Sequence, residues 1–401
     1  MSGTGGSVPR LRFPGFGGEW GHLKLGELGP VSMCKRIMKE ETNTTGDVPF
    51  YKIGTFGKEP DAFISTELYA KFKKKYPYPK VGDILISAAG TIGRLVIFDG
   101  SPAYFQDSNI VWVANGEEKV SNAFLFHCYE NTRWTTENTT IARLYNDNLR
   151  SLRLVAPSLP EQKKIAAFLG AVDAKIAALR ARVLGLQTYK RGLMQSLFSQ
   201  TLRFTQPDGT AFPEWEEKRL GEVATRCKAK NGDLQYMRVL TNSAAQGVVD
   251  QGSYFDKDIA NAENLGGYYI VKLGDFVYNP RISVTAPVGP IKRNDVGDGV
   301  MSPLYTVFRF KEANTDFFNT FFETTFWHDY MKSVANYGAR HDRMAISMGD
   351  FMDMPLPFPH PEEQAKIVEA LSAMDAKISA VQAQVDRMQD FKKGLLQQMF
   401  V

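Results

Sequence analysis

The chain has 401 residues, of which 43% are hydrophobic and 23% charged, with a formal net charge of +4 at pH 7. This length predicts two or three domains, and the mild charge permits a nucleic-acid partner without requiring one. The cysteines, Cys34, Cys128 and Cys227, form no Cys-x-x-Cys pair, which argues against a disulfide framework or a cysteine zinc site. Residues 1–7 lack the apolar core of a signal peptide, and no apolar run approaches a membrane span. We therefore expect a cytoplasmic protein without membrane contact.

Residues 1–157 are predicted to form a first domain of mixed α/β structure. Its strand-like runs are Ile84–Ile86, Leu95–Phe98 and Ile110–Val113. Residues 71–80 carry five lysines, three aromatic residues and no acid. Lysines at this density attract phosphate, although a solvated basic loop explains the segment equally well.

Residues 158–203 are predicted to form a first long helix. Pro160 and Glu161 mark its start, because proline and acidic residues favour the first turn of a helix. Its apolar residues recur at steps of 3, 4, 3, 4 and 3, which is a heptad seam: Leu169, Val172, Ile176, Leu179, Val183 and Leu186. A seam of this kind predicts a partner helix.

Residues 204–359 are predicted to form a second mixed α/β domain, and residues 360–401 a second long helix. The domain has strand-like runs at Phe276–Tyr278 and Tyr305–Phe310. The helix repeats the heptad seam with Leu371, Met374, Ile378, Val381, Val385 and Met388. We expect the two helices to pack on each other, whereas an ordinary helix docked on its own domain would show a broader apolar stripe.

The second helix repeats the register of the first helix without a gap. Residues 162–198 align with residues 364–400 without a gap at a constant offset of 202, and 18 of the 37 positions are identical. A weaker echo precedes each copy, where Trp20 and Gly26 match Trp215 and Gly221 at an offset of 195. The chain is therefore a domain followed by a helix, twice. Such pseudo-two-fold repetition suits an approximately symmetric partner such as a DNA duplex.

Charge and position in loops indicate the candidate DNA-binding residues. Arginine can read guanine with two hydrogen bonds, but a single sequence does not separate a base reader from a phosphate clamp. The candidates in the first domain are Lys71, Lys73, Lys74, Lys75, Lys80, Thr91, Arg94 and Arg143. Those in the second domain are Arg281, Ser283, Thr285, Arg340, His341 and Arg343.

The sequence predicts no catalytic residue and no metal site on this chain. It contains neither a Gly-x-x-x-x-Gly-Lys-Ser/Thr loop nor a Gly-x-Ser-x-Gly elbow, and its five histidines show no metal-ligand spacing. Asp208, Glu216 and Lys218 fit a loose pattern of metal-dependent nucleases, a weak signal that keeps a nuclease as a remote alternative. A coiled-coil adaptor without DNA affinity is the other alternative.

The arrangement resembles the specificity (S) subunit of type I restriction-modification systems over essentially the whole chain. The motifs that carry the resemblance occur twice: a helix-start motif of proline, glutamate and glutamine, then Asp-Ala-Lys-Ile, then a basic residue followed by Gly-Leu. In the first copy these are Pro160–Gln162, Asp173–Ile176 and Arg191–Leu193.

The resemblance implies two α/β target recognition domains, each reading one half of a bipartite site in double-stranded DNA. It implies that the two helices form an antiparallel coiled coil that sets the spacer, with two methyltransferase subunits flanking the chain. Restriction subunits would join them in the full complex. S-adenosylmethionine would belong to the methyltransferase, and ATP and Mg²⁺ to the restriction partner, leaving this chain without a cofactor. Target recognition domains vary greatly within the family, so no base-contacting residue is implied by motif.

Overall fold

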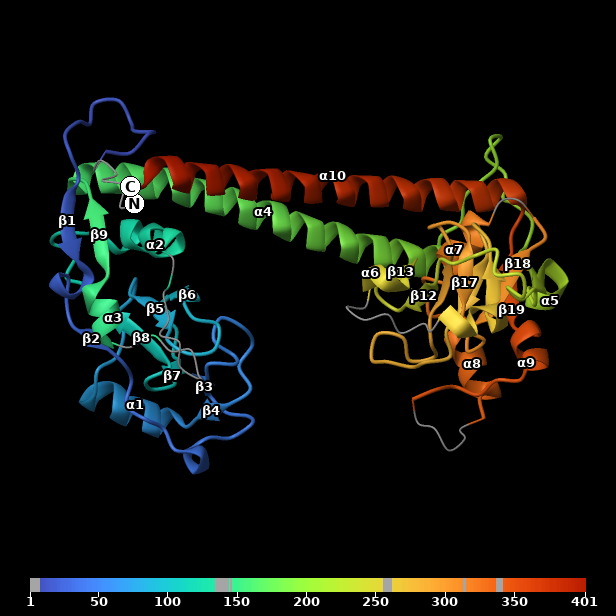
Figure 1. Cartoon of the computed structure of the whole chain (residues 1–401), viewed down its shortest axis with the longest axis horizontal. Coiled ribbons are helices and arrows are strands. Elements are labelled where there is room, and N and C mark those ends of the chain that lie inside the picture. Colours follow the sequence, from blue (N-terminus) through green and yellow to red (C-terminus); the bar gives the residue numbers. More distant parts are fainter. Residues whose placement is uncertain are drawn as a thin grey trace. The chain divides into compact units, whose positions relative to one another are not determined.

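The structure, a computed structural model, describes residues 8–132, 134, 144, 146–254, 262–312, 315–336 and 342–401. Three candidate DNA-binding residues, Arg143, Arg340 and His341, lie outside this described part. Residues 1–182 and 381–401 form one compact unit, and residues 183–380 form a second. Each unit holds a globular part and one segment of each of two long helices, α4 (Leu159–Phe198) and α10 (Pro361–Met399) (Figure 1).

The globular part of the first unit is built on a four-stranded antiparallel sheet in the order β2-β8-β5-β6. All residues of β5 and β8 are buried, as expected for aliphatic runs in central strands. A smaller sheet has the order β4-β3-β7, and β1 pairs with β9. The strands are β1 (Gly21–Lys24), β2 (Val31–Ser32), β3 (Val48–Tyr51), β4 (Phe63–Ile64), β5 (Ile84–Ser87), β6 (Leu95–Ile97), β7 (Tyr104–Phe105), β8 (Ile110–Val113) and β9 (Arg153–Ala156). The helices are η1 (Leu25–Glu27), η2 (Lys39–Glu41), α1 (Thr66–Lys75), α2 (Asn122–Asn131) and α3 (Asn146–Ser151).

The globular part of the second unit has an equivalent sheet in the order β11-β18-β15-β16, beside the pairs β10-β19, β12-β13 and β14-β17. Its strands are β10 (Glu216–Arg219), β11 (Ala224–Arg226), β12 (Leu240–Ser243), β13 (Gly247–Asp250), β14 (Tyr269–Val271), β15 (Phe276–Tyr278), β16 (Ile291–Arg293), β17 (Gly299–Met301), β18 (Thr306–Phe310) and β19 (Pro355–Phe358). Its helices are α5 (Leu220–Val223), α6 (Gln251–Tyr254), η3 (Ala262–Gly267), α7 (Asp316–Phe321), α8 (His328–Val334) and α9 (Met348–Met352).

The two globular parts share a topology although their sequences differ. The strands of the two four-stranded sheets correspond in chain order, and β1-β9 corresponds to β10-β19. The turn before the central strand is also the same: Asp83 accepts a hydrogen bond from the Lys80 amide at 2.7 Å, and Asp275 accepts one from the Lys272 amide at 2.7 Å. The repetition predicted from the helices therefore extends to the domains.

Helices α4 and α10 pack antiparallel in each unit. In the first unit, Asp173 near the start of α4 pairs with Lys392 near the end of α10 at 2.7 Å. In the second unit, Lys190 near the end of α4 pairs with Asp375 near the start of α10 at 2.8 Å. The Leu11 amide donates to the Gln398 carbonyl at 2.9 Å, which holds the leading segment of the chain against α10 in the first unit.

The predicted seam residues are all wholly or partly buried. Eight of them are buried: Leu169, Val172, Ile176, Leu179, Val183, Leu371, Val381 and Val385. Leu186, Met374, Ile378 and Met388 are partly buried. The first turns of each helix also join the core of a globular part, where Leu169 contributes to the first core and Leu371 to the second. Each helix thus begins as part of a domain.

A buried carboxylate anchors the first turn of each long helix. Glu161 accepts hydrogen bonds from Arg12 Nε at 2.7 Å and Nη2 at 2.8 Å. Glu363 accepts them from Arg203 Nε at 3.1 Å and Nη2 at 2.9 Å. The following glutamine, Gln162 in α4, donates to the Pro157 carbonyl at 2.8 Å. The glutamate and glutamine of the helix-start motif therefore tie the first turn of each long helix to its own unit.

Candidate nucleic-acid interface

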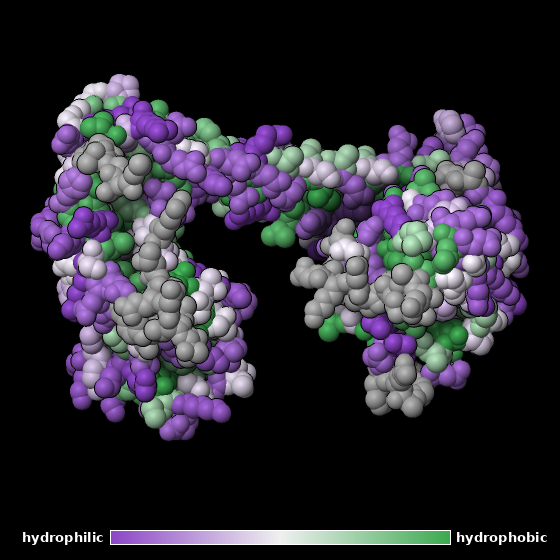
Figure 2. Space-filling model, in the orientation of Figure 1, coloured by the Kyte–Doolittle hydropathy of each residue, from purple (hydrophilic) through white to green (hydrophobic). Residues whose placement is uncertain are grey.

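The lysine cluster of the first unit lies at the end of a helix and not in a loop, apart from Lys80. Ser65 caps α1 by accepting from the Leu68 amide, and Lys73, Lys74 and Lys75 occupy the last turn, where cations favour the helix dipole. No described carboxylate forms an ion pair with these three lysines, and all three are exposed. Figure 2 shows hydrophilic residues over the part of the first unit where α1 lies. The helix end therefore presents uncompensated positive charge.

Lys73 is the most constrained lysine of this cluster. Its Nζ donates to the Tyr69 hydroxyl at 3.0 Å and lies 4.9 Å from the centre of the Tyr78 ring. Burial and the neighbouring Tyr69 raise the pKa of Tyr78, so this ring stays neutral beside the ammonium. Lys71, Lys74 and Lys75 are exposed on the same helix and Lys80 follows it.

The glycine-rich turn between β5 and β6 carries two of the candidates, and the structure gives them different roles. Thr91 is exposed at its tip. Arg94 is partly buried, and its Nη1 donates to the Phe56 carbonyl at 2.7 Å. A Cβ at Gly93 would meet the Trp134 ring at 2.2 Å, so this close turn requires glycine. The guanidinium of Arg94 thus supports the fold, whereas Thr91 faces solvent.

The loop after β15 carries three candidates of the second unit. Arg281, Ser283 and Thr285 are all exposed. Ser283 forms a tight turn, in which its Oγ accepts from the Ala286 amide at 3.1 Å. Val284, at the tip, is fully exposed. The loop therefore presents an arginine, two hydroxyls and one methyl-bearing side chain.

The structure brings Arg281 and Arg343 together from distant parts of the sequence. Their backbones form an isolated antiparallel bridge. On either side of it, the Ile282 amide donates to the Asp342 carbonyl at 3.1 Å, and the Met344 amide donates to the Pro280 carbonyl at 2.9 Å. The bridge thus places the exposed Arg281 beside Arg343, which is partly buried and lies 3.6 Å from Asp342.

A cavity of about 490 Å³ lies beside this loop. Its wall is formed by Arg281, Ser283 and Thr285 together with polar residues of β12 and its neighbours, among them Asn242 and Asn279. Asn242 Nδ2 donates to the carbonyl of Val277 at 2.7 Å and to that of Pro290 at 3.2 Å. These buried amides are missing from the candidates predicted from the sequence. For Asn242 the signal was the polar run Thr241-Asn-Ser243, which lies in strand β12 and is buried.

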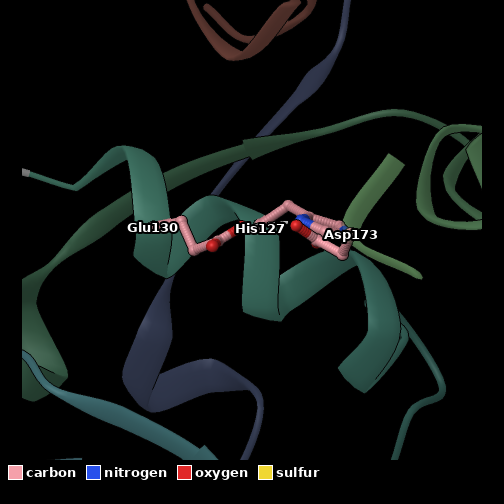
Figure 3. A group of neighbouring side chains, drawn as sticks. All are labelled: His127, Glu130 and Asp173. Carbon is pink, nitrogen blue, oxygen red and sulfur yellow. Dashed lines mark hydrogen bonds and ion pairs between the residues drawn. The ribbon is translucent and has the colours of Figure 1, made fainter. Parts of the chain in front are cut away.

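One group of side chains has the spacing of metal ligands. His127, Glu130 and Asp173 offer ligand atoms that all lie within 4.8 Å of one another (Figure 3). The ammonium of Lys392, however, lies 2.6 Å from Glu130 and 2.7 Å from Asp173. Burial favours a higher pKa for Glu130, but hydrogen bonds from His127 and Lys392 outweigh it and leave the pKa below its usual range. A lysine already supplies the positive charge, so the group is an ion-pair network.

The carboxylates of the nuclease-like pattern are occupied by local contacts. Asp208 accepts from the Thr210 amide at 2.9 Å and from its hydroxyl at 2.6 Å. Glu216 pairs with Lys218 at 3.3 Å. These contacts are typical of a turn and a strand edge.

The sequence matches a known family model twice. The model, described as the type I restriction modification DNA specificity domain, matches residues 17–184 and again residues 213–386. The chain belongs to this family. The two matches fall on the two copies of the repeat, and a specificity subunit of this kind carries two target recognition domains and is not catalytic.

Relatives of this specificity subunit include a putative type I restriction enzyme specificity subunit of Haemophilus influenzae, 59% identical over 148 residues. That alignment covers 37% of this chain and only 38% of the relative. The putative MjaX specificity subunit of Methanocaldococcus jannaschii is 22% identical over 79% of this chain and 77% of its own length. A crystal structure of a type I restriction-modification S subunit from M. genitalium shares the fold, with a TM-score of 0.55 and 13% identity over 98% of this chain and 99% of that one. In the described part of the specificity subunit, no helix has the length and apolarity needed to cross a bilayer.

Proposed function

We propose that each target recognition domain reads one half of a bipartite site in double-stranded DNA, and that α4 and α10 set the spacer between the halves. The repetition of one sheet order on two antiparallel helices is the observation that carries this proposal. A protein with two similar reading domains matches two half-sites, just as dimeric DNA-binding proteins match theirs. We also propose that the protein acts in the cytoplasm, where its bacterial and archaeal relatives would meet DNA.

The proposed domains are residues 1–157 and 204–359, and the proposed spacer helices are residues 158–203 and 360–401. Strands β9 and β19, which end at Ala156 and Phe358, support these boundaries because each closes its domain just before a long helix begins. The apolar seam described above would form the interface of the coiled coil.

The proposed protein partners are two methyltransferase subunits, joined by restriction subunits in the full complex. Two exposed aromatic side chains occupy equivalent positions in the repeat and support two equal docking places: Tyr189 is 62% exposed and Phe391 is 51% exposed. Aromatic side chains are enriched where proteins bind each other. S-adenosylmethionine would be bound by the methyltransferase, and ATP and Mg²⁺ by the restriction subunit.

The test is an exchange of residues 13–157 for the matching domain of a relative, followed by mapping of methylated DNA in cells that carry the complex. One half-site should change and the other should stay, because each mismatched base pair costs about 1–3 kcal/mol and the exchange alters several at once. Replacing Tyr189 and Phe391 by alanine should lower the number of bound methyltransferase subunits, measured by mass. A simultaneous change of both half-sites would contradict independent reading.

The adaptor alternative makes the opposite prediction for DNA. A DNA-reading complex must bind more weakly as salt rises, because phosphate binding releases counterions. Replacing Lys71, Lys74 and Lys75 by glutamine should flatten the log–log salt dependence by roughly 0.9 for each phosphate that is no longer neutralised. A complex without salt-dependent binding would favour the adaptor.

A further inference from the structure

We propose that Arg281 specifies a guanine in the half-site read by the second target recognition domain. This inference rests on the proposed function, because it assumes that the domain reads DNA. It goes further by naming one side chain and the base that it selects.

The first argument is that Arg281 is available for a ligand when most other arginines of its unit are not. Arg203, Arg219, Arg238, Arg293 and Arg309 pair with carboxylates. Arg343 lies 3.6 Å from Asp342, and Arg226 has a buried Nε. Arg281 is exposed, and no described carboxylate forms an ion pair with it. Its hydrogen-bond donors are therefore free to meet an acceptor outside the chain.

The second argument is that the backbone of Arg281 is held from several sides. Its amide donates to Asn279 Oδ1 at 3.1 Å, and the Asn279 amide group donates in turn to the Asn242 carbonyl at 2.9 Å. Asn242 Nδ2 joins Val277 and Pro290, which lie at the two ends of the loop. The bridge to Arg343 fixes the other side. A side chain that recognises a base needs a backbone held in this way, because base recognition depends on precise placement.

The third argument is that the two ends of the loop between β15 and β16 pass close together at Gly289. Gly289 has a φ of +77°, and a Cβ there would meet the Asn279 carbonyl oxygen at 2.1 Å. Glycine at this position lets the returning strand pass directly beside the residue that holds Arg281. The loop is therefore built around a close backbone approach.

The chemistry of the exposed loop matches the edges of bases. The planar guanidinium of arginine donates two parallel hydrogen bonds to guanine O6 and N7, the commonest specific contact in the major groove. Ser283 and Thr285 can donate to or accept from any base, and the exposed Val284 offers methyl groups suited to the methyl of thymine. A phosphate clamp would need none of this apolar surface.

The experiment uses the complete complex with its methyltransferase subunits. The methylated sites of the wild type define both half-sites first, and binding is then measured with duplexes that carry single-base changes. Arg281→Ala should relax one guanine position in one half-site, reducing the preference for guanine by roughly 5- to 150-fold, while the other half-site stays unchanged. The Arg281→Lys complex should bind DNA more tightly than the Arg281→Ala complex. It should recover little of the preference for guanine, since lysine lacks the planar fork.

Two further variants separate reading from general binding. Asn279→Ala should relax the same guanine position, because it frees the backbone of Arg281, and a purely structural role would not select one position. Lys228→Ala, an exposed cation of the same unit, should leave every base preference unchanged. An Arg281→Ala complex that binds all duplexes equally more weakly, or that keeps the wild-type preferences, would overturn the inference. A wild-type complex without bipartite methylation would instead refute the proposed function.

Discussion

Arg12 and Arg203 each stabilise a carboxylate that the fold removes from water. Glu363 has a side chain that is 0% exposed, and Arg203 supplies two of its hydrogen bonds. Trp215 Nε1 supplies a third at 2.9 Å. Removing the arginine would leave a buried negative charge with one neutral donor, which is far more costly than breaking a surface pair.

Arg203→Met should therefore destabilise the second unit by about 3–5 kcal/mol. The matched control is Arg219→Met, whose pair with Asp353 is 66% and 56% exposed and should contribute less than about 1 kcal/mol. Hydrogen exchange in the first turns of α10, within the full chain, measures the local opening free energy. Equal small decreases in both variants would mean that Glu363 finds another partner.

The residues of the helix-start motif show what a sequence reveals and what it conceals. The glutamates and glutamines are recognisable because they recur in both copies of a matched helix. Their partners are not, since Arg12 lies 149 positions from Glu161 and Arg203 lies 160 from Glu363. In the same way, nothing in the sequence indicates that the backbones of Arg281 and Arg343 pair. Local periodicity predicts elements, whereas contacts between distant loops require the fold.

At the scale of elements, the lysine cluster shows a missed local signal. Residues 71–75 stand out in the sequence only by their charge. Ser65 followed by Glu67, however, is a helix start with an acidic first turn, and α1 runs from Thr66 to Lys75. The helix periodicity is hidden because Phe72 and Tyr69 supply only a short apolar face. The predicted strands fared better: β5, β8 and β15 contain the predicted runs, and β6 and β18 differ from them by one residue at an end.

The long helices allow a test of the spacer. Deleting one heptad from each, residues 176–182 and 378–384, keeps the apolar seam in phase. It also keeps the two ion pairs, Asp173–Lys392 and Lys190–Asp375, because both lie outside the deleted segments. The rod shortens by about 10 Å at 1.5 Å per residue, so the gap between half-sites should shrink by about three base pairs.

Mapping of methylated sites measures this gap directly. Deleting the heptad from α4 alone is the control, because the two ion pairs would then demand different registers and the coiled coil should fail to assemble. An active complex with both heptads deleted that still modifies sites at the original spacing would show that helix length does not set the distance.

At the scale of the whole molecule, the chain is a repeat whose copies differ in their proposed reading surfaces and agree in their helices. The helices match at 18 of 37 aligned positions without a gap, while the loops beside β12 and β15 have no counterpart of equal sequence in the first unit. A shared frame with two separate reading surfaces allows one half-site to change without disturbing the other.

The hydrogen bond between the Leu11 amide and the Gln398 carbonyl places the two ends of the described chain beside each other. A short linker is therefore enough to join these two ends within the first unit. A circular permutant that joins Val401 to Val8 through a short glycine-serine linker, and opens instead at Ser199 after α4, should fold and methylate the same DNA sites. A permutant with its new chain ends between Leu179 and Arg180, inside α4, should fail to assemble. A first permutant that folds but modifies different sites would contradict this expectation. It would show that recognition depends on the order in which the two domains follow each other along the chain.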